Sequence, residues 1–254
     1  MGGIGQFPLD SLSAFVPALV IIILNIIWGN NVFKENILEL RFGSWKSWII
    51  WPLVIAVIEN IIYALTYFLS PAVFLSQQDI VEGIKQTVFD TGSLPASLVC
   101  IFVMNIFIPP ILNLPLLVGG ELGWRGFLMP RLLKIFPTPK AFLMGGAIWG
   151  VWHLFEILLG YRYPNESILG ILLMILFCIP AGVILQYVYL KSGSIFVVAL
   201  CHGSLNSTTT AFMDFLMNEE KIDPIIHGST GIIGIIIWWI FGAVFCARLK
   251  KEYG

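Results

Sequence analysis

Three short segments of the chain carry polar residues of the kinds that activate water or stabilise a developing negative charge. Glu121 and Arg125 lie four residues apart in GGELGWRGF, His153 ends WGVWH, and His202 and Asn206 lie four residues apart in HGSLN. Residues four apart share one face of a helix. A carboxylate and a histidine can polarise water for attack on a carbonyl, and a second imidazole with an amide can stabilise the oxyanion. The residue types therefore indicate hydrolysis of an amide bond.

Other polar residues within apolar segments leave alternatives open. Glu59 and Asn60 are typical of hydrogen bonding between helices, whereas Glu156 follows His153 by one helical turn. His153 and Glu156 could ligate a divalent metal, but zinc usually takes three or four ligands, and no HExxH motif is present. We therefore predict no metal ion and no other cofactor.

The composition indicates the environment of these residues. The chain is 58% hydrophobic and 11% charged, whereas a soluble domain has about 25% charged residues. The net charge of −1 provides no basic surface for nucleic acid, so we expect no nucleic-acid partner. We predict a polytopic integral membrane protein in contact with membrane lipid.

Seven apolar segments are long enough to cross a bilayer, which takes roughly 20 residues as a helix. Backbone groups in lipid must pair within the segment, and a helix achieves this. We expect an all-α transmembrane helical bundle with about seven spans, forming a single domain over residues 1–254. The predicted spans are 11–29, 46–69, 96–118, 141–160, 167–190, 194–216 and 229–249.

One further segment, 121–134, mixes leucine and phenylalanine with arginine and lysine. This pattern predicts an amphipathic helix at the cytoplasmic interface. The positive-inside rule sets the orientation: eleven of the 14 lysines and arginines fall on one side of a chain with seven spans. We expect that side and the C-terminus to be cytoplasmic, with the protein in the plasma membrane.

The two histidines are expected to meet within the bundle. From span entries near 141 and 194, His153 lies about 18 Å and His202 about 12 Å along its helix, at about 1.5 Å per residue. The polar residues should converge in one buried, hydrated pocket that opens toward the cytoplasmic half.

Together the three segments resemble the motifs of the CPBP family of intramembrane proteases, which includes CAAX prenyl endopeptidases and Abi-like bacterial proteins linked to bacteriocin immunity. Glu121 and Arg125 match the second Glu and the Arg of EExxxR, His153 matches the His of FxxxH with Trp in place of Phe, and His202 with Asn206 matches HxxxN. The resemblance covers about residues 97–216. It implies that the first Glu and His153 activate water, that His202 and Asn206 form the oxyanion hole, and that Glu121 and Arg125 support the site.

Gly120 stands where the family has its first Glu, and glycine has no base. Glu121 can turn inward, Glu156 or Glu59 can supply the carboxylate, or the protein can be a catalytically impaired binding or bacteriocin-immunity factor. A transporter or structural membrane protein is a third interpretation. We predict an intramembrane endopeptidase that acts on membrane-associated or lipidated peptides; the sequence indicates neither prenyl recognition nor an oligomeric state.

Overall fold

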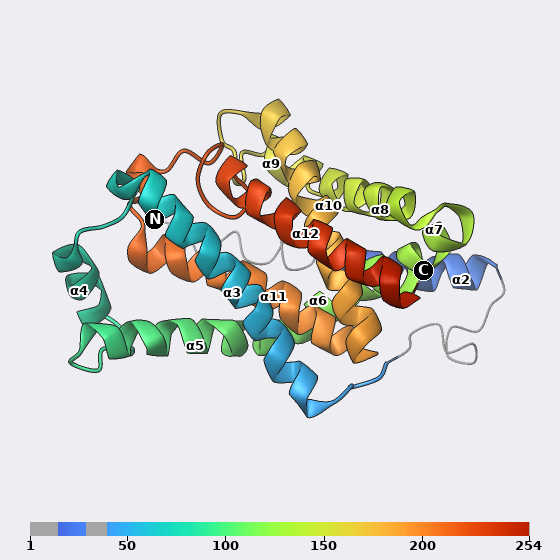
Figure 1. Ribbon diagram of the computed structural model, residues 1–254, viewed down its shortest axis with the longest axis horizontal. Coiled ribbons are helices and arrows are strands. Elements are labelled where there is room, and N and C mark those ends of the chain that lie inside the picture. Colours follow the sequence, from blue (N-terminus) through green and yellow to red (C-terminus); the bar gives the residue numbers. More distant parts are fainter. Residues whose placement is uncertain (1–14, 29–39, 254) are drawn as a thin grey trace.

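The structure, a computed structural model, describes residues 15–28 and 40–253, and within them it is helical with no strand. Figure 1 shows long helices running side by side, with shorter helices at their ends. The elements are α2 (Val16–Ile27), α3 (Trp45–Leu69), η1 (Pro71–Val73), α4 (Gln77–Lys85), α5 (Leu94–Leu112), α6 (Leu114–Glu121), π-helical η2 (Leu122–Leu128), α7 (Met129–Ile135), α8 (Thr138–Trp152), α9 (Leu154–Leu158), α10 (Ser167–Ser192), α11 (Ile195–Leu216), η3 (Glu219–Lys221) and α12 (Ile232–Tyr253).

The all-α transmembrane bundle is confirmed, but the count of seven spans is not. In the described part of the chain, four helices are long and apolar enough to cross a membrane: α3, α5, α10 and α12. The predicted spans 96–118 and 141–160 are each divided into two helices, and the described helix within 11–29 has 12 residues. An apolar run reports which residues avoid water, but it does not report where the helix breaks.

Helix α10 occupies the centre of the bundle, where it packs against α8, α11 and α12. The most apolar stretch of α10 is 61% buried by protein, whereas that of the peripheral α5 is 22% buried. Pro180 of α10 has no N–H and therefore leaves the carbonyl of Leu176 without its helical donor. Trp239 of α12 donates its indole N–H to that carbonyl at 2.9 Å, so the two helices are joined where α10 is interrupted.

The same chemistry joins α5 to α11. The proline pair at 109–110 leaves two carbonyls of α5, those of Asn105 and Ile106, without a helical N–H donor. Ser207 of α11 donates to the first carbonyl at 2.5 Å, and Ser204 donates to the second at 2.7 Å. Backbone groups in a membrane need a partner within the protein. These bonds therefore fix α11, which carries two of the candidate site residues.

Helix α8 approaches α10 through small residues. Gly146 and Gly150 are four residues apart, and a Cβ on either would overlap the backbone of α10 at Ile179 or Ile175. Such pairs let membrane helices pack backbone to backbone. The close packing sets the position of the end of α8, where His153 lies.

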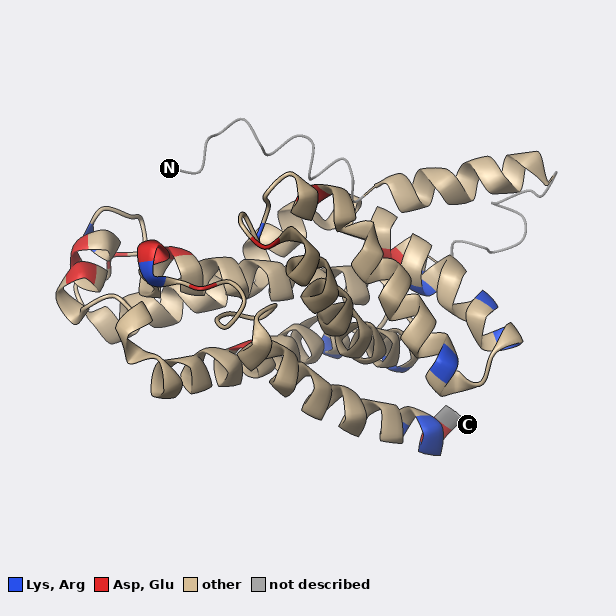
Figure 2. Cartoon of the chain, turned by 90° about the horizontal axis from the view of Figure 1, so that it is seen from above, with Lys and Arg blue, Asp and Glu red and all other residues tan. Residues whose placement is uncertain are grey.

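Charged residues divide between the two ends of the molecule. Figure 2 shows lysines and arginines gathered at the end that holds the C-terminus, and acidic residues gathered at the opposite end, around α4 and η3. This separation agrees with the asymmetry counted from the sequence. Lys34, which belongs to that count, lies outside the described residues.

Candidate active site

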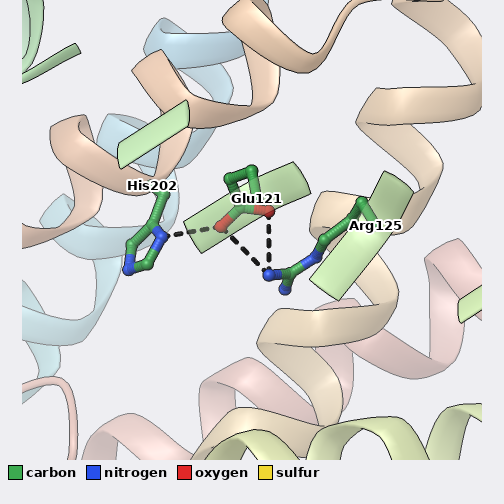
Figure 3. Close-up of polar contacts among 3 residues, drawn as sticks. All are labelled: Glu121, Arg125 and His202. Carbon is green, nitrogen blue, oxygen red and sulfur yellow. Dashed lines mark hydrogen bonds and ion pairs between the residues drawn. The ribbon is translucent and has the colours of Figure 1, made fainter. Parts of the chain in front are cut away.

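Glu121, Arg125 and His202 form one buried polar group (Figure 3). Arg125 donates from Nη1 to Glu121 Oε1 at 3.0 Å and lies 2.9 Å from Oε2, while Nδ1 of His202 lies 2.7 Å from Oε1. Glu121 is 0% and Arg125 is 2% exposed. Burial of a carboxylate costs free energy unless a partner charge or hydrogen bonds compensate it, and here two helical segments supply both.

Trp149 of α8 packs against this group. The Arg125 guanidinium lies 4.5 Å from the centre of a Trp149 ring, and the His202 ring meets Trp149 edge-on at 5.3 Å. Cation–π attraction strengthens when the cation is removed from water. The tryptophan found in place of phenylalanine in the second motif therefore links the Glu121–Arg125 pair to the histidine of α11.

His153 lies where α8 ends and α9 begins, and its backbone is no longer α-helical. Its Nδ1 is 3.0 Å from the carbonyl oxygen of Trp149. A carbonyl only accepts hydrogen bonds, so Nδ1 carries the proton and the neutral ring keeps a lone pair on Nε2. The backbone thereby selects the tautomer that can act as a base.

The candidate side chains line two neighbouring cavities, the larger of about 170 Å³. Each cavity is lined by Trp149, His153, Arg162, His202 and Asn206. The larger one is also lined by Gly120, Glu156 and three aromatic residues, Trp124, Trp152 and Tyr161. The expected convergence of two histidines and one amide in a pocket is therefore present, and it involves three segments distant in sequence.

The structure places Glu121 differently from the predicted interfacial helix. Residues 121–135 are helical, but Glu121 and Arg125 turn into the bundle, so the interfacial interpretation is wrong for this part of the segment. The periodicity of a sequence shows which residues share the polar face of a helix, but it does not show which other segment packs against that face. The covering group is His202, which is 81 residues away in sequence.

The opening of the pocket toward the cytoplasmic half stays a prediction, and the loops that line the two cavities bear on it. Arg162, Ser229 and Thr230 line the cavities, and the charge count assigns the loops that carry them to the side opposite the basic residues. His153 lies at the far end of α8 from its entry, and the cavity extends from there toward those loops. The depth estimate along the helix did not include the loops that fold over its end.

Glu59, Asn60 and Asn105 form hydrogen bonds away from the candidate site residues. Glu59 accepts hydrogen bonds from Ser229 at 2.6 Å and Thr209 at 3.1 Å, as expected for interhelical hydrogen bonding. Asn60 and Asn105 donate to carbonyls of their own helices. No three His, Cys, Asp or Glu side chains gather as a metal-binding group in the described part of the chain, so we derive no step through a metal ion.

Arg162 is a lining residue that the sequence did not single out. It is counted there only as one cation of a loop, and its place beside His153 depends on how residues 159–166 fold back. Its backbone is left-handed, with φ 64°, which is uncommon for a residue other than glycine. No motif in the sequence reports that conformation.

Comparisons with known proteins find similarity over the segment that carries these residues. Residues 95–208 match the family described as type II CAAX prenyl endopeptidase Rce1-like. The chain is also 33% identical over 150 residues, 57% of its length, to a protein named CAAX prenyl protease 2 from Methanococcus maripaludis. The chain spans about half the length of this curated relative, 51%. The matched region contains the described helices that bear all three motifs, so this part of the chain is similar to CAAX prenyl endopeptidases.

Proposed function

We propose that the protein is an intramembrane endopeptidase that hydrolyses peptide bonds of membrane-associated substrates. The observation that supports this proposal is that His153 and His202 line one cavity while both Nδ1 atoms are engaged by the protein. Each imidazole therefore has only Nε2 to offer to a water molecule or a substrate. Asn206 lines the same cavity and adds an amide that donates hydrogen bonds.

The first step assigned to these residues is general base catalysis. Nε2 of His153 removes a proton from water while the water oxygen bonds to the carbonyl carbon of the scissile peptide. The carbonyl oxygen becomes an oxyanion, which accepts hydrogen bonds from the Asn206 amide and from Nε2–H of His202. As the C–N bond breaks, the imidazolium of His153 returns the proton to the departing amine. The products are a new carboxylate and a new amine.

Glu121 and Arg125 act through His202 in this mechanism. The carboxylate accepts a hydrogen bond from Nδ1–H of His202 and orients the ring, whose Nε2–H donates to the oxyanion. Arg125 holds the carboxylate in place, and Trp149 packs against both Arg125 and His202. Glu121 lines neither cavity, so we assign it to support of the site and not to activation of water.

The absence of a side chain at Gly120 favours a second candidate function. Gly120 lines the larger cavity with His153, and the family resemblance places its water-activating carboxylate at this position. Glu156 lines the same cavity and is the alternative source of a carboxylate, whereas Glu59 is engaged by hydroxyl groups. If no carboxylate takes over the role of the missing side chain at position 120, the protein would bind peptides as a catalytically impaired binding or immunity factor.

We also propose the orientation and surroundings of the protein. The end that holds the C-terminus and most lysines and arginines faces the cytoplasm, as the positive-inside rule requires, and we place the protein in the plasma membrane. Its partners are membrane lipid and a peptide or protein substrate held at the membrane. The relative's printed name concerns CAAX prenyl substrates, and we extend to this chain only the broader class of membrane-associated and lipidated peptides.

Cleavage by the purified protein in liposomes tests the proposal. A panel of membrane-anchored peptides is incubated with the parent, and new termini are identified by mass spectrometry. We expect cleavage by the parent that persists with metal chelators and falls about 10²- to 10⁴-fold in His153→Ala. Phe155→Ala, which changes a side chain 75% exposed on α9, is the control and should retain activity.

The same assay separates the two candidate functions. If only Gly120→Glu cleaves, the parent is the impaired binding protein and the endopeptidase proposal fails. Loss of cleavage in Glu156→Gln, with peptide binding retained, would identify Glu156 as the carboxylate that replaces the missing one. Loss of cleavage with chelators would contradict water activation by His153 without a metal.

A further inference from the structure

Arg162 lines the candidate site without forming an ion pair with any described residue. Its side chain lines both cavities, together with His153, His202 and Asn206. Its Nε is buried and has no hydrogen-bond partner, and Arg162 forms no ion pair with any described residue. A buried donor on a cation is expensive to leave unsatisfied, so this position calls for an acceptor that a ligand would bring.

The backbone holds Arg162 in this position. Its φ of 64° lies in the left-handed region, where a side chain other than glycine, asparagine or aspartate is disfavoured. Such conformations persist where the surrounding structure imposes them, and they gather at binding sites. The preceding Tyr161 packs its ring 5.3 Å from the guanidinium carbon and lines the larger cavity as well.

The nearby buried carboxylate does not serve as the partner of Arg162. Glu59 is 0% exposed and within electrostatic range of Arg162, but its two oxygens accept hydrogen bonds from Ser229 and Thr209. Trp238 donates to the same Ser229 hydroxyl at 2.9 Å, so this network is complete without a cation. The Arg162 side chain lines both cavities, and its buried Nε has no hydrogen-bond partner.

We propose that Arg162 is a binding residue for a carboxylate of the substrate peptide, an inference that rests on the proposed function of the same cavity. A guanidinium binds a carboxylate through paired N–H donors. An anion held there would place the neighbouring peptide bond against His153, His202 and Asn206. The carboxylate can be the C-terminus of the peptide or an acidic side chain next to the scissile bond. The substrate class is thus a membrane-anchored peptide with a negative charge close to the bond that is cut.

Peptide binding by the reconstituted protein tests this subsite independently of hydrolysis. The probes are fluorescent, membrane-anchored peptides of one sequence with a free C-terminal carboxylate, an amidated C-terminus, or an amidated C-terminus with one added acidic side chain. Affinity is measured by anisotropy in nanodiscs for the parent, Arg162→Asn and Arg162→Lys. Asparagine tolerates the left-handed backbone, and thermal unfolding reports whether each variant is folded. Arg131→Asn, at an exposed cation, is the matched control.

We expect the parent to bind one carboxylate peptide at least about tenfold more tightly than the neutral peptide. Arg162→Asn should remove that preference, Arg162→Lys should keep part of it, and Arg131→Asn should leave it unchanged. The preferred peptide identifies the source of the carboxylate. If Arg162→Asn weakened the binding of all three peptides equally, or changed the binding of none, the proposed subsite would be overturned. If no peptide is cleaved but the preference follows Arg162, the hydrolysis proposal fails while the subsite stands.

Discussion

Glu121 and Glu59 are both buried carboxylates, but Glu121 has a charged partner and Glu59 has neutral partners. Glu121 is held by a cation and a histidine, and Glu59 is held by the hydroxyls of Ser229 and Thr209. Both side chains are 0% exposed. In our proposal this difference separates a group that supports the site from a group that joins helices, and burial alone does not distinguish them.

The partner decides what each carboxylate can do. A carboxylate bound to Nδ1 of His202 fixes the orientation of that ring. The hydroxyl groups that donate to Glu59 are neutral. Their hydrogen bonds join α3 to α11 and to the loop before α12. We therefore expect substitutions at Glu121 to change catalysis and substitutions at Glu59 to change mainly stability.

The largest effect on stability is expected for Arg125→Met, which leaves Glu121 buried without its cation. Removing one partner of a buried pair destabilises by about 3–5 kcal/mol, because the other charge is left uncompensated. Thermal unfolding in detergent should show this loss for Arg125→Met and almost none for Lys134→Met, an exposed cation on α7. Equal stability of the two variants would show that Glu121 does not depend on Arg125.

A smaller loss is expected for Ser229→Ala, which removes a neutral partner of Glu59. The substitution leaves Glu59 with its bond from Thr209 and leaves the Trp238 indole N–H without an acceptor. An unsatisfied buried polar group costs about 1–3 kcal/mol. The free energy of unfolding should fall within that range, and a loss as large as that of Arg125→Met would remove the contrast between the two carboxylates.

The smallest effect is expected for Glu59→Gln. The amide keeps an oxygen that accepts from Ser229 or Thr209 while it removes the negative charge, so we expect stability within about 1 kcal/mol of the parent. Cleavage of the peptide panel should be unchanged. A large loss of cleavage, with the protein folded, would mean that Glu59 supplies the missing carboxylate and that its role has been misassigned.

The sequence predicts the helical bundle and most of its site because these depend on local pattern. Apolar runs mark the helices, and the pairs at positions 121 and 125 and at 202 and 206 place polar groups on single helix faces. Prolines at 109, 110 and 180 remove the helical donors of three carbonyls. The serines and tryptophan that replace those donors come from other helices, and no local rule selects them.

The errors arise where tertiary contacts override local pattern. Segment 121–134 is amphipathic, yet its polar pair turns inward because His202 and Trp149 cover it. Arg162 enters the site through a left-handed backbone in a loop, which the sequence does not encode as a motif. Both cases concern a charge whose environment comes from residues distant in the chain.

The most direct test of the account is a double-substitution cycle at Glu121 and His202. Single-turnover cleavage rates are measured in liposomes for the parent, Glu121→Gln, His202→Gln and the double variant. If the carboxylate acts only through the imidazole, the double variant should be no slower than the slower single variant, because residues that act as one unit lose their effect together. Losses that multiply would show that Glu121 contributes independently of His202, and that result would contradict the mechanism.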